Sequence, residues 1–170
     1  MAATAYIGLG SNLAEPTQHI LSAIEDIHNI QNSSLARTSR LYETAPIGPQ
    51  DQPNYINAAV SLETSLDPYE LLAALQQIEN QHGRTRDTGH WGARTLDLDV
   101  LLYNGLVSND PILTLPHPEL HNRAFVLYPL LDLDKDLEVP KLGKLQTLIK
   151  TLNEAAPRAI QSPSFNPMST

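Results

Sequence analysis

The sequence predicts an α+β fold of the ferredoxin-like sandwich type, a mainly antiparallel sheet with helices packed on its faces. Several short segments carry the apolar and polar alternation of half-buried strands, and segments with helical spacing separate them. The expected order is strand, helix, strand, strand, helix, strand, then a hairpin and further helices. Because strands arrive in consecutive pairs, they should pair antiparallel, with the helices against the sheet.

Size and composition favour a single domain. A chain of 170 residues can bury a core of its own, and we expect residues 1–157 to form this domain and residues 158–170 a loose tail. No apolar run approaches the roughly 20 residues that span a bilayer, and no signal peptide is apparent. Cysteine is absent, which excludes disulfides and thiol nucleophiles and fits a reducing compartment. The net charge of -8 argues against broad attraction to nucleic acid or anionic lipid.

The first half of the chain supplies three expected strands and one helix. The first strand covers residues 3–9 and ends at Gly8-Leu9-Gly10, which we interpret as a tight strand-to-helix turn rather than a phosphate loop, since the third glycine of that motif is missing. A core-facing helix should span residues 17–30. A second strand is expected over 35–42, and a third over 55–62 beyond a proline-rich loop.

The second helix begins with a clear signal. Asp67 is placed to cap it, proline follows at the first turn, and Glu70 takes the third position of a capping box. Gly83 is expected to end it. Gln76 and Glu79 lie off its apolar stripe.

The stretch from Gly83 to Tyr103 carries the chemistry. Its first part is an arginine-rich loop, and Thr95 to Tyr103 alternates with period 2. One face should hold Leu96, Leu98, Val100 and Leu102, and the other Asp97, Asp99, Leu101 and Tyr103.

Asp97 and Asp99 should stand roughly 6.6 Å apart at Cα on one strand face, at about 3.3 Å of rise per residue. Such a pair can bind divalent metal, and magnesium commonly takes one or two carboxylates plus substrate phosphates. Arg84, Arg86 and Arg94 in the adjacent loop can meet phosphate oxygens. The pattern therefore indicates phosphoryl transfer. The alternative is an amphipathic strand whose acids simply face water.

Beyond Tyr103 the elements are shorter. Asn104-Gly105 predicts a hairpin in which residues 106–108 fold back on the preceding strand. A helix is expected over 119–131 and a last amphipathic helix over 142–152. His117 and His121 do not form the H-E-x-x-H pattern, so a zinc site is not expected.

Four stretches together resemble the hydroxymethyl-dihydropterin pyrophosphokinase family of folate biosynthesis. They are AYIGLGSNL, YETAPIGPQDQPNYIN, IENQHGRTRDTGHWGARTLDLDVLLY and LPHPELHNRAFVLYPL, and the resemblance runs from Ala5 to about Pro140. The W-G-x-R-T-L-D-L-D core is the most specific part.

The resemblance implies that ATP gives its β,γ-diphosphate to the hydroxymethyl group of the pterin and that AMP leaves. It further implies two magnesium ions held by Asp97 and Asp99, with ATP as co-substrate. It implies these further site residues: catalytic Arg84 and Arg94; pterin-binding Thr44, Ile47, Tyr55, Asn57, Trp91 and Phe125; ATP-binding Gln76, Glu79, Arg86, Thr114, His117 and Arg123. We expect a cytoplasmic monomer acting on small molecules, without nucleic acid or membrane.

Two positions depart from the family pattern. His90 stands where arginine is common, and Ala93 where proline is usual. The first should weaken one phosphate contact near neutral pH, where histidine is mostly uncharged, and the second should loosen the loop.

Two other functions fit parts of the sequence. A nucleotide-sugar transferase could use D-x-D to hold a metal-bound diphosphate, although 170 residues leave little room for a separate acceptor site. A ferredoxin-like binding module is the non-enzymatic alternative, and the negative charge and few aromatics argue against RNA as its ligand.

Overall fold

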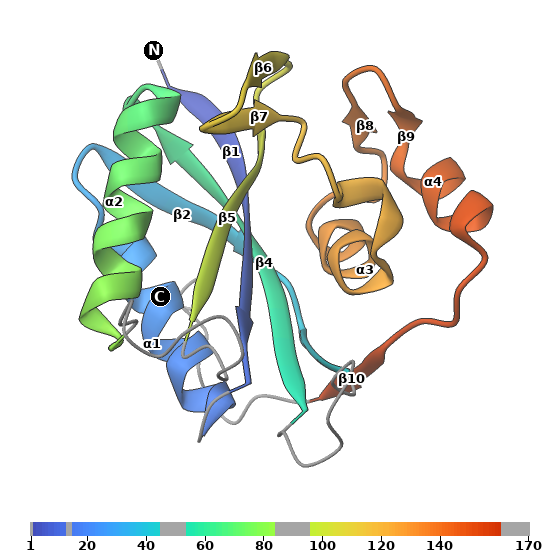
Figure 1. Cartoon of the computed structure of the whole chain (residues 1–170), viewed down its shortest axis with the longest axis horizontal. Coiled ribbons are helices and arrows are strands. Elements are labelled where there is room, and N and C mark those ends of the chain that lie inside the picture. Colours follow the sequence, from blue (N-terminus) through green and yellow to red (C-terminus); the bar gives the residue numbers. More distant parts are fainter. Residues whose placement is uncertain (1, 13–14, 45–53, 84–95, 161–170) are drawn as a thin grey trace.

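The structure is a computed structural model of the chain, and it describes residues 2–12, 15–44, 54–83 and 96–160. A six-stranded sheet forms its centre (Figure 1), in the order β10-β3-β4-β1-β5, with β2 also paired to β4. Every pairing is antiparallel. The strands are β1 (Ala3–Ser11), β2 (Ser33–Thr38), β3 (Leu41–Thr44), β4 (Tyr55–Thr64), β5 (Asp97–Tyr103) and β10 (Arg158–Ile160).

Helices cover both faces of the sheet, as Figure 1 shows. On one face lie α1 (Pro16–His28) and α2 (Pro68–Gln81), the two crossover helices of a β-α-β-β-α-β unit. On the other lie the short helix η2 (Leu120–Asn122), α3 (Ala124–Leu133) and α4 (Leu145–Leu152). Two small hairpins complete the fold: β6 (Ser108–Asp110) with β7 (Leu113–Leu115), and β8 (Glu138–Val139) with β9 (Gly143–Lys144). The predicted α+β ferredoxin-like sandwich is confirmed.

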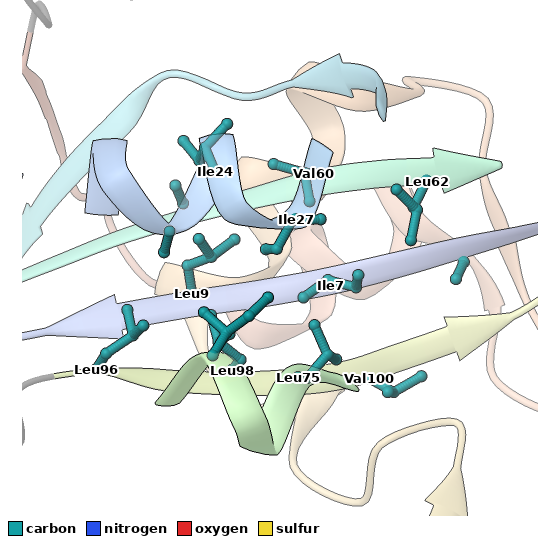
Figure 2. Packing of buried hydrophobic residues seen from close by; sticks show 14 of the residues in the cluster. Ile7, Leu9, Ile24, Ile27, Val60, Leu62, Leu75, Leu96, Leu98 and Val100 are labelled. Atoms are coloured by element: carbon teal, nitrogen blue, oxygen red, sulfur yellow. The ribbon is translucent and has the colours of Figure 1, made fainter. Parts of the chain in front are cut away.

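Two hydrophobic cores hold the layers together. The first lies between the sheet and α1 and α2, where Ile7, Leu75 and Leu98 interdigitate (Figure 2). The second lies under α3 and α4 and includes Leu101 and Leu127. Alternation along β1 and β4 sends side chains to the two cores in turn.

A β-bulge at Leu101 corrects one sequence prediction. Along β1 the register with β5 shifts between Tyr6 and Ile7, so Leu101 is the extra residue. Asp97 and Asp99 keep the face expected for them, but past the bulge the faces exchange. Leu102 packs with Leu101 in the second core, and Tyr103 packs against the first. The prediction that Leu102 shares a face with Leu96 was therefore wrong.

The expected strand over 35–42 is two strands separated by a break. At this break Ser39 makes both hydrogen bonds to the backbone of Ala59 on β4. The Ser39 amide donates to the Ala59 carbonyl at 2.9 Å, and the Ser39 hydroxyl accepts from the Ala59 amide at 2.8 Å. The polar pair Ser39-Arg40 thus satisfies the backbone of β4 while the chain changes direction between β2 and β3.

The sequence signals for the start and end of α2 are confirmed, although the helix boundaries differ from those predicted. Asp67 and Glu70 form the predicted capping box, and Gly83 follows α2 with a positive φ of 85°. The helix expected over 119–131 is split, because Arg123 is extended and separates η2 from α3.

Two predictions in the C-terminal half differ from the structure. The Asn104-Gly105 turn forms, but residues 106–108 do not pair with β5; Ser108 begins β6, which pairs with β7 instead. Arg158–Ile160, placed in the expected loose tail, pair with β3 as strand β10. Ile160 also packs against the first core.

Candidate active site

A pocket of about 820 Å³ lies on the α3 face of the sheet. Strands β1, β3, β4 and β5 contribute to it, together with the segment around η2 and the first turn of α3. It is lined by Gly8, Leu9, Gly10, Thr44, Tyr55, Asn57, Ala58, Ala59, Asp97, Asp99, Leu101, His117, Glu119, Asn122, Arg123, Ala124, Phe125, Val126 and Glu154.

Two glycines of β1 lie between the side chains of its neighbours. Gly10 is paired with Asp97 on β5 and with Asn57 on β4, and Gly8 is paired with Asp99. A Cβ at Gly10 would lie 3.0 Å from the Asn57 side-chain oxygen. The glycines are therefore within a strand and leave room in the pocket, which corrects the prediction that they form a turn.

Asp97 and Asp99 both line the pocket, from alternate positions of β5. Asp97 is half-buried and Asp99 is exposed, so neither points into the apolar interior. Among the described residues no group of three or more His, Cys, Asp or Glu could hold a metal. The two carboxylates of Asp97 and Asp99 fit magnesium, which completes its octahedron with water and substrate oxygens.

The polar edge of the pocket comes from β3 and β4. Thr44 and Tyr55 are paired across these strands. The Asn57 amide nitrogen donates to the Thr44 hydroxyl at 3.3 Å, and Asn57 is buried. Three of the predicted pterin residues therefore meet at one place.

The opposite wall is the start of α3. Phe125 and Arg123 line the pocket, and the Arg123 guanidinium carbon lies 5.7 Å from the centre of the Phe125 ring. No side chain caps this helix end, and its first residues line the pocket, so the positive end of the helix dipole lies at the pocket wall. Arginine and helix dipole together favour an anion here.

His117 lies between this wall and the aspartates. Burial lowers the pKa of its ring below the ordinary value, and the charge of Arg123 acts in the same direction, while Asp99 and Glu119 oppose it. Its Nδ1 accepts from the Glu119 amide at 3.2 Å. The ring is therefore neutral near pH 7, with its proton on Nε2.

Three residues predicted on the nucleotide side do not line this pocket. Gln76 is exposed on α2. Thr114 donates its hydroxyl to the Asp110 carbonyl at 3.0 Å within the β6-β7 hairpin. Glu79 is buried, and its carboxylate accepts from the Leu98 amide at 2.7 Å, between the two aspartates of β5. Glu79 thus holds the edge strand that carries the acids.

Several predicted site residues lie outside the described part of the chain. They are Ile47, Arg84, Arg86, Trp91 and Arg94, together with the two family departures His90 and Ala93.

Some pocket residues were not predicted from the sequence. Glycines at alternate positions of a strand pattern, such as Gly8 and Gly10, are a usable signal of close approach by a ligand. Asn122 and Glu119 flank predicted residues in sequence. No signal in the sequence pointed to Glu154, which reaches the pocket from the segment after α4.

The described lining carries more acid than base. Asp97, Asp99, Glu119 and Glu154 face Arg123 and the neutral His117. An anionic ligand such as a nucleoside triphosphate would therefore be repelled by this lining unless a cation were also bound.

Comparison with known proteins decides the family. The family model of 7,8-dihydro-6-hydroxymethylpterin-pyrophosphokinase (HPPK) matches residues 6–135. The chain belongs to this family. The 2-amino-4-hydroxy-6-hydroxymethyldihydropteridine pyrophosphokinase of Haemophilus influenzae is 46% identical over 147 residues, covering 86% of this chain and 91% of the relative. The same-named Pseudomonas aeruginosa protein is 46% identical over 144 residues, covering 85% and 88%. This HPPK-family chain is thus an ATP-dependent diphosphotransferase of folate biosynthesis.

Solved structures show the same fold. The HPPK-DHPS of Plasmodium falciparum superposes with a TM-score of 0.70 over 89% of this HPPK-family chain, at 15% identity. This chain covers 45% of that longer one. Likewise, it covers 18% of the folic acid synthesis protein fol1 of Pneumocystis carinii, at 43% identity over 138 residues.

None of the helices among the described residues is long and apolar enough to cross a bilayer.

Proposed function

We propose that the chain transfers the β,γ-diphosphate of ATP to the hydroxymethyl group of 6-hydroxymethyl-7,8-dihydropterin, releasing AMP, with two magnesium ions bridging the phosphates. The observation that carries this proposal is the single pocket shared by the β5 aspartates, the Asn57 edge and the Phe125 wall. One pocket can therefore hold both substrates in contact, as group transfer between them requires.

Asp97 and Asp99 would hold the metal ions. Magnesium, when bound, neutralises the phosphate oxygens and acts as a Lewis acid on the transferring group. The acidic lining supports this assignment, since an ATP of about four negative charges needs a cation to enter a pocket with four carboxylates.

The pterin would lie between Tyr55 and Phe125, with Asn57 at its edge. Aromatic rings offer flat apolar faces to a heterocycle. An Asn side chain presents a donor and an acceptor in one plane, and its bond to Thr44 fixes the orientation of that plane. We assign Thr44 and Ile47 to the same subsite.

The nucleotide phosphates would be met by Arg123 and His117. Arg123 is fixed against Phe125 at the positive end of α3. His117 can donate from Nε2, because its Nδ1 already accepts from the Glu119 amide. We propose that Arg84, Arg86, Arg94 and Trp91, which follow α2 in the sequence, serve the phosphates and the pterin, and that Gln76, Glu79 and Thr114 belong to the nucleotide side.

The reaction needs positioning and charge neutralisation more than a strong base. The hydroxymethyl oxygen attacks the β-phosphorus, the bond from the α,β-bridging oxygen breaks, and AMP takes that oxygen. The hydroxyl proton leaves to water or a phosphate oxygen.

A direct assay tests the proposal. Purified protein is mixed with ATP, magnesium and 6-hydroxymethyl-7,8-dihydropterin, and AMP and the pterin diphosphate are measured by chromatography. AMP should form in proportion to the pterin diphosphate, and omission of either pterin or magnesium should abolish both. ADP as the product, or AMP without pterin, would contradict the proposal. Binding without turnover would favour a binding module, and turnover only with nucleotide sugars would favour the D-x-D transferase.

We further propose that the protein acts as a cytoplasmic monomer. The absence of cysteine suits a reducing compartment.

A further inference from the structure

Behind the pocket, a polar cluster joins β3 to the end of α3. The carboxylate of Asp132 on α3 accepts hydrogen bonds from a tyrosine hydroxyl, a backbone amide and a guanidinium group. Its Oδ2 accepts from the Tyr42 hydroxyl at 2.7 Å and from the Arg40 amide at 3.1 Å. The Arg40 guanidinium donates to both carboxylate oxygens, each at 3.2 Å. The same guanidinium donates to the Tyr42 hydroxyl at 3.0 Å, so the three groups form a closed network.

Tyr42 lies directly beside the predicted pterin edge. In the sheet it is paired with Asn57, and on β3 it lies two residues before Thr44, so these three side chains share one face. Tyr42 is 2% exposed and is not among the residues that line the pocket. It therefore supports the pocket from behind and leaves the ligand space open.

The Tyr42 hydroxyl is a permanent donor in this network. Burial, followed by the bond to Asp132, raises the pKa of Tyr42 to about 12. At any physiological pH the hydroxyl keeps its proton and donates it to the carboxylate.

The other end of the network controls where α3 lies. Asp132 follows Phe125 by seven residues on the same helix, roughly 10 Å along its axis. The Leu133 carbonyl, next to Asp132, also accepts from the Arg37 guanidinium at 3.0 Å. Pro129 lies within α3 and cannot donate to the Phe125 carbonyl, but Leu127 and Leu130 pack both turns of the helix into the second core. Holding the last turn against β2 and β3 therefore also positions the first turn, where Phe125 lines the pocket.

We infer that Tyr42 and Asp132 are positioning residues that set the distance between the two walls of the pterin subsite, Asn57 and Thr44 on the sheet and Phe125 on α3. The identity of the pterin as occupant rests on the proposed function. The positioning itself is a property of the protein and can be tested without a ligand.

Tyr42→Phe removes one hydroxyl and leaves the buried ring in place. The matched control is Tyr69→Phe, which removes another tyrosine hydroxyl that donates to an aspartate, Asp110, between α2 and β6 and away from the pocket. We expect the KM for the pterin to rise on the order of 10-fold in Tyr42→Phe, near the lower end of what one hydrogen bond to a charged acceptor contributes. The KM for ATP should change less than twofold, and Tyr69→Phe should leave both unchanged.

Amide hydrogen exchange supplies the readout that does not depend on activity. In Tyr42→Phe the amides of Val126 and Leu127, which close the first turn of α3 onto the Arg123 carbonyl, should exchange several-fold faster than in the wild type and in Tyr69→Phe. Asp132→Asn, which keeps an oxygen acceptor for the Tyr42 hydroxyl and loses the charge, should give an intermediate rate.

Two results overturn the inference. One is unchanged exchange in the first turn of α3 in a folded Tyr42→Phe variant. The other is an active Tyr42→Phe enzyme whose pterin KM matches that of Tyr69→Phe. A wild-type protein that makes no AMP from ATP and the pterin would overturn the proposed function alone, and the exchange experiment would still decide the positioning role.

Discussion

Gly10 lines the pocket and has no side chain, and the arrangement of its neighbours depends on that. It is paired with Asn57 on one side and Asp97 on the other, so any side chain there would compete with the groups that face the ligand. Its backbone is that of an ordinary strand, and the requirement for glycine is therefore one of space.

Gly10→Ala should weaken pterin binding while leaving the fold intact. The added Cβ would lie 3.0 Å from the Asn57 side-chain oxygen, so the amide group must move by a few tenths of an ångström, which weakens the 3.3 Å bond from its nitrogen to Thr44. Displacing one buried hydrogen-bonding group costs about 1–3 kcal/mol, so the KM for the pterin should rise on the order of 10-fold or more. Steady-state kinetics measure this. Gly105→Ala, where no atom lies within 4 Å of the new Cβ, is the control, and equal KM values in the two variants would refute the argument.

Asp97→Ala and Asp99→Ala test the metal assignment. Each removes one hard oxygen ligand from a pair that must anchor the phosphates, so kcat should fall about 100-fold or more, because metal stabilisation of a phosphoryl transition state is worth several kcal/mol. The Kd for the pterin, measured by calorimetry, should change little. Glu138→Gln, an exposed carboxylate on β8, controls for the change in net charge. Magnesium-dependent turnover close to wild type in both aspartate variants would exclude this role.

At the residue scale, the local pattern predicted the position of the aspartates well. Period-2 alternation is enough to put Asp97 and Asp99 on one face, and both line the pocket. It could not reveal that Glu79 is buried, because the reason is a tertiary contact: the Leu98 amide of the edge strand needs an acceptor, and α2 supplies it. Glu154 was equally beyond reach, since its place depends on the path of the chain after α4.

At the scale of elements, α1 and α2 are fastened by a chain of polar contacts. The His82 Nε2 lies 2.9 Å from the Asp26 carboxylate, and the His82 Nδ1 lies 3.3 Å from the His19 Nδ1. Because a carboxylate accepts, the His82 Nε2 donates to Asp26, and of the two facing Nδ1 atoms one donates and the other accepts. Burial lowers the pKa of His19, and His82 lowers it further, while Glu15 opposes the shift.

This contact predicts a pH-dependent stability. The unfolded chain takes a proton on His19 near pH 6.5, whereas the folded protein takes it only at lower pH. On His19 the unfolded state therefore binds more protons in that window, and the contribution of His19 to the free energy of unfolding decreases as the pH falls below about 6.5. Thermal unfolding between pH 7.5 and 5 should show a smaller decrease of Tm in His19→Gln than in the wild type. His28→Gln, an exposed histidine of α1, should follow the wild type; a His19→Gln curve parallel to the wild type would contradict the prediction.

The elements that the sequence predicted less well share one physical cause. Strand and helix patterns assume an uninterrupted period, and the structure interrupts it at Leu101 by a bulge, at Ser39 by a side chain that replaces the ladder, and at Arg123 by an extended residue. At Ser39 the interruption satisfies a neighbour in space, the Ala59 backbone, rather than one in sequence. Two of them lie next to the pocket: the bulge follows the aspartates, and Arg123 begins the wall that carries Phe125.

At the scale of the whole molecule, the sheet separates two functions. The face under α1 and α2 is a continuous apolar core, and the opposite face is apolar only under α3 and α4, with the pocket beside them. The order of elements was sufficient to predict this sandwich, because consecutive strands and their crossover helices leave few antiparallel arrangements. The pairing of the C-terminal segment was not predictable, since β10 is three residues long and carries no alternation of its own.

β10 is the strand whose removal tests this view of the molecule. It covers the edge of β3 through three paired residues, and Ile160 packs on the first core. The ion pair from Arg158 to Glu43, at 3.5 Å with the arginine side chain 78% exposed, adds little stability.

We compare a chain ending at residue 157 with one ending at residue 160, so that only β10 differs. Loss of these contacts should cost about 1–2 kcal/mol and lower Tm by roughly 2–8 °C for a chain of this size. Because the exposed edge of β3 can then pair with another chain, the shorter protein should also aggregate more readily on heating, as light scattering would show. Equal Tm values would mean that the domain ends at residue 157 and that β10 contributes nothing to it.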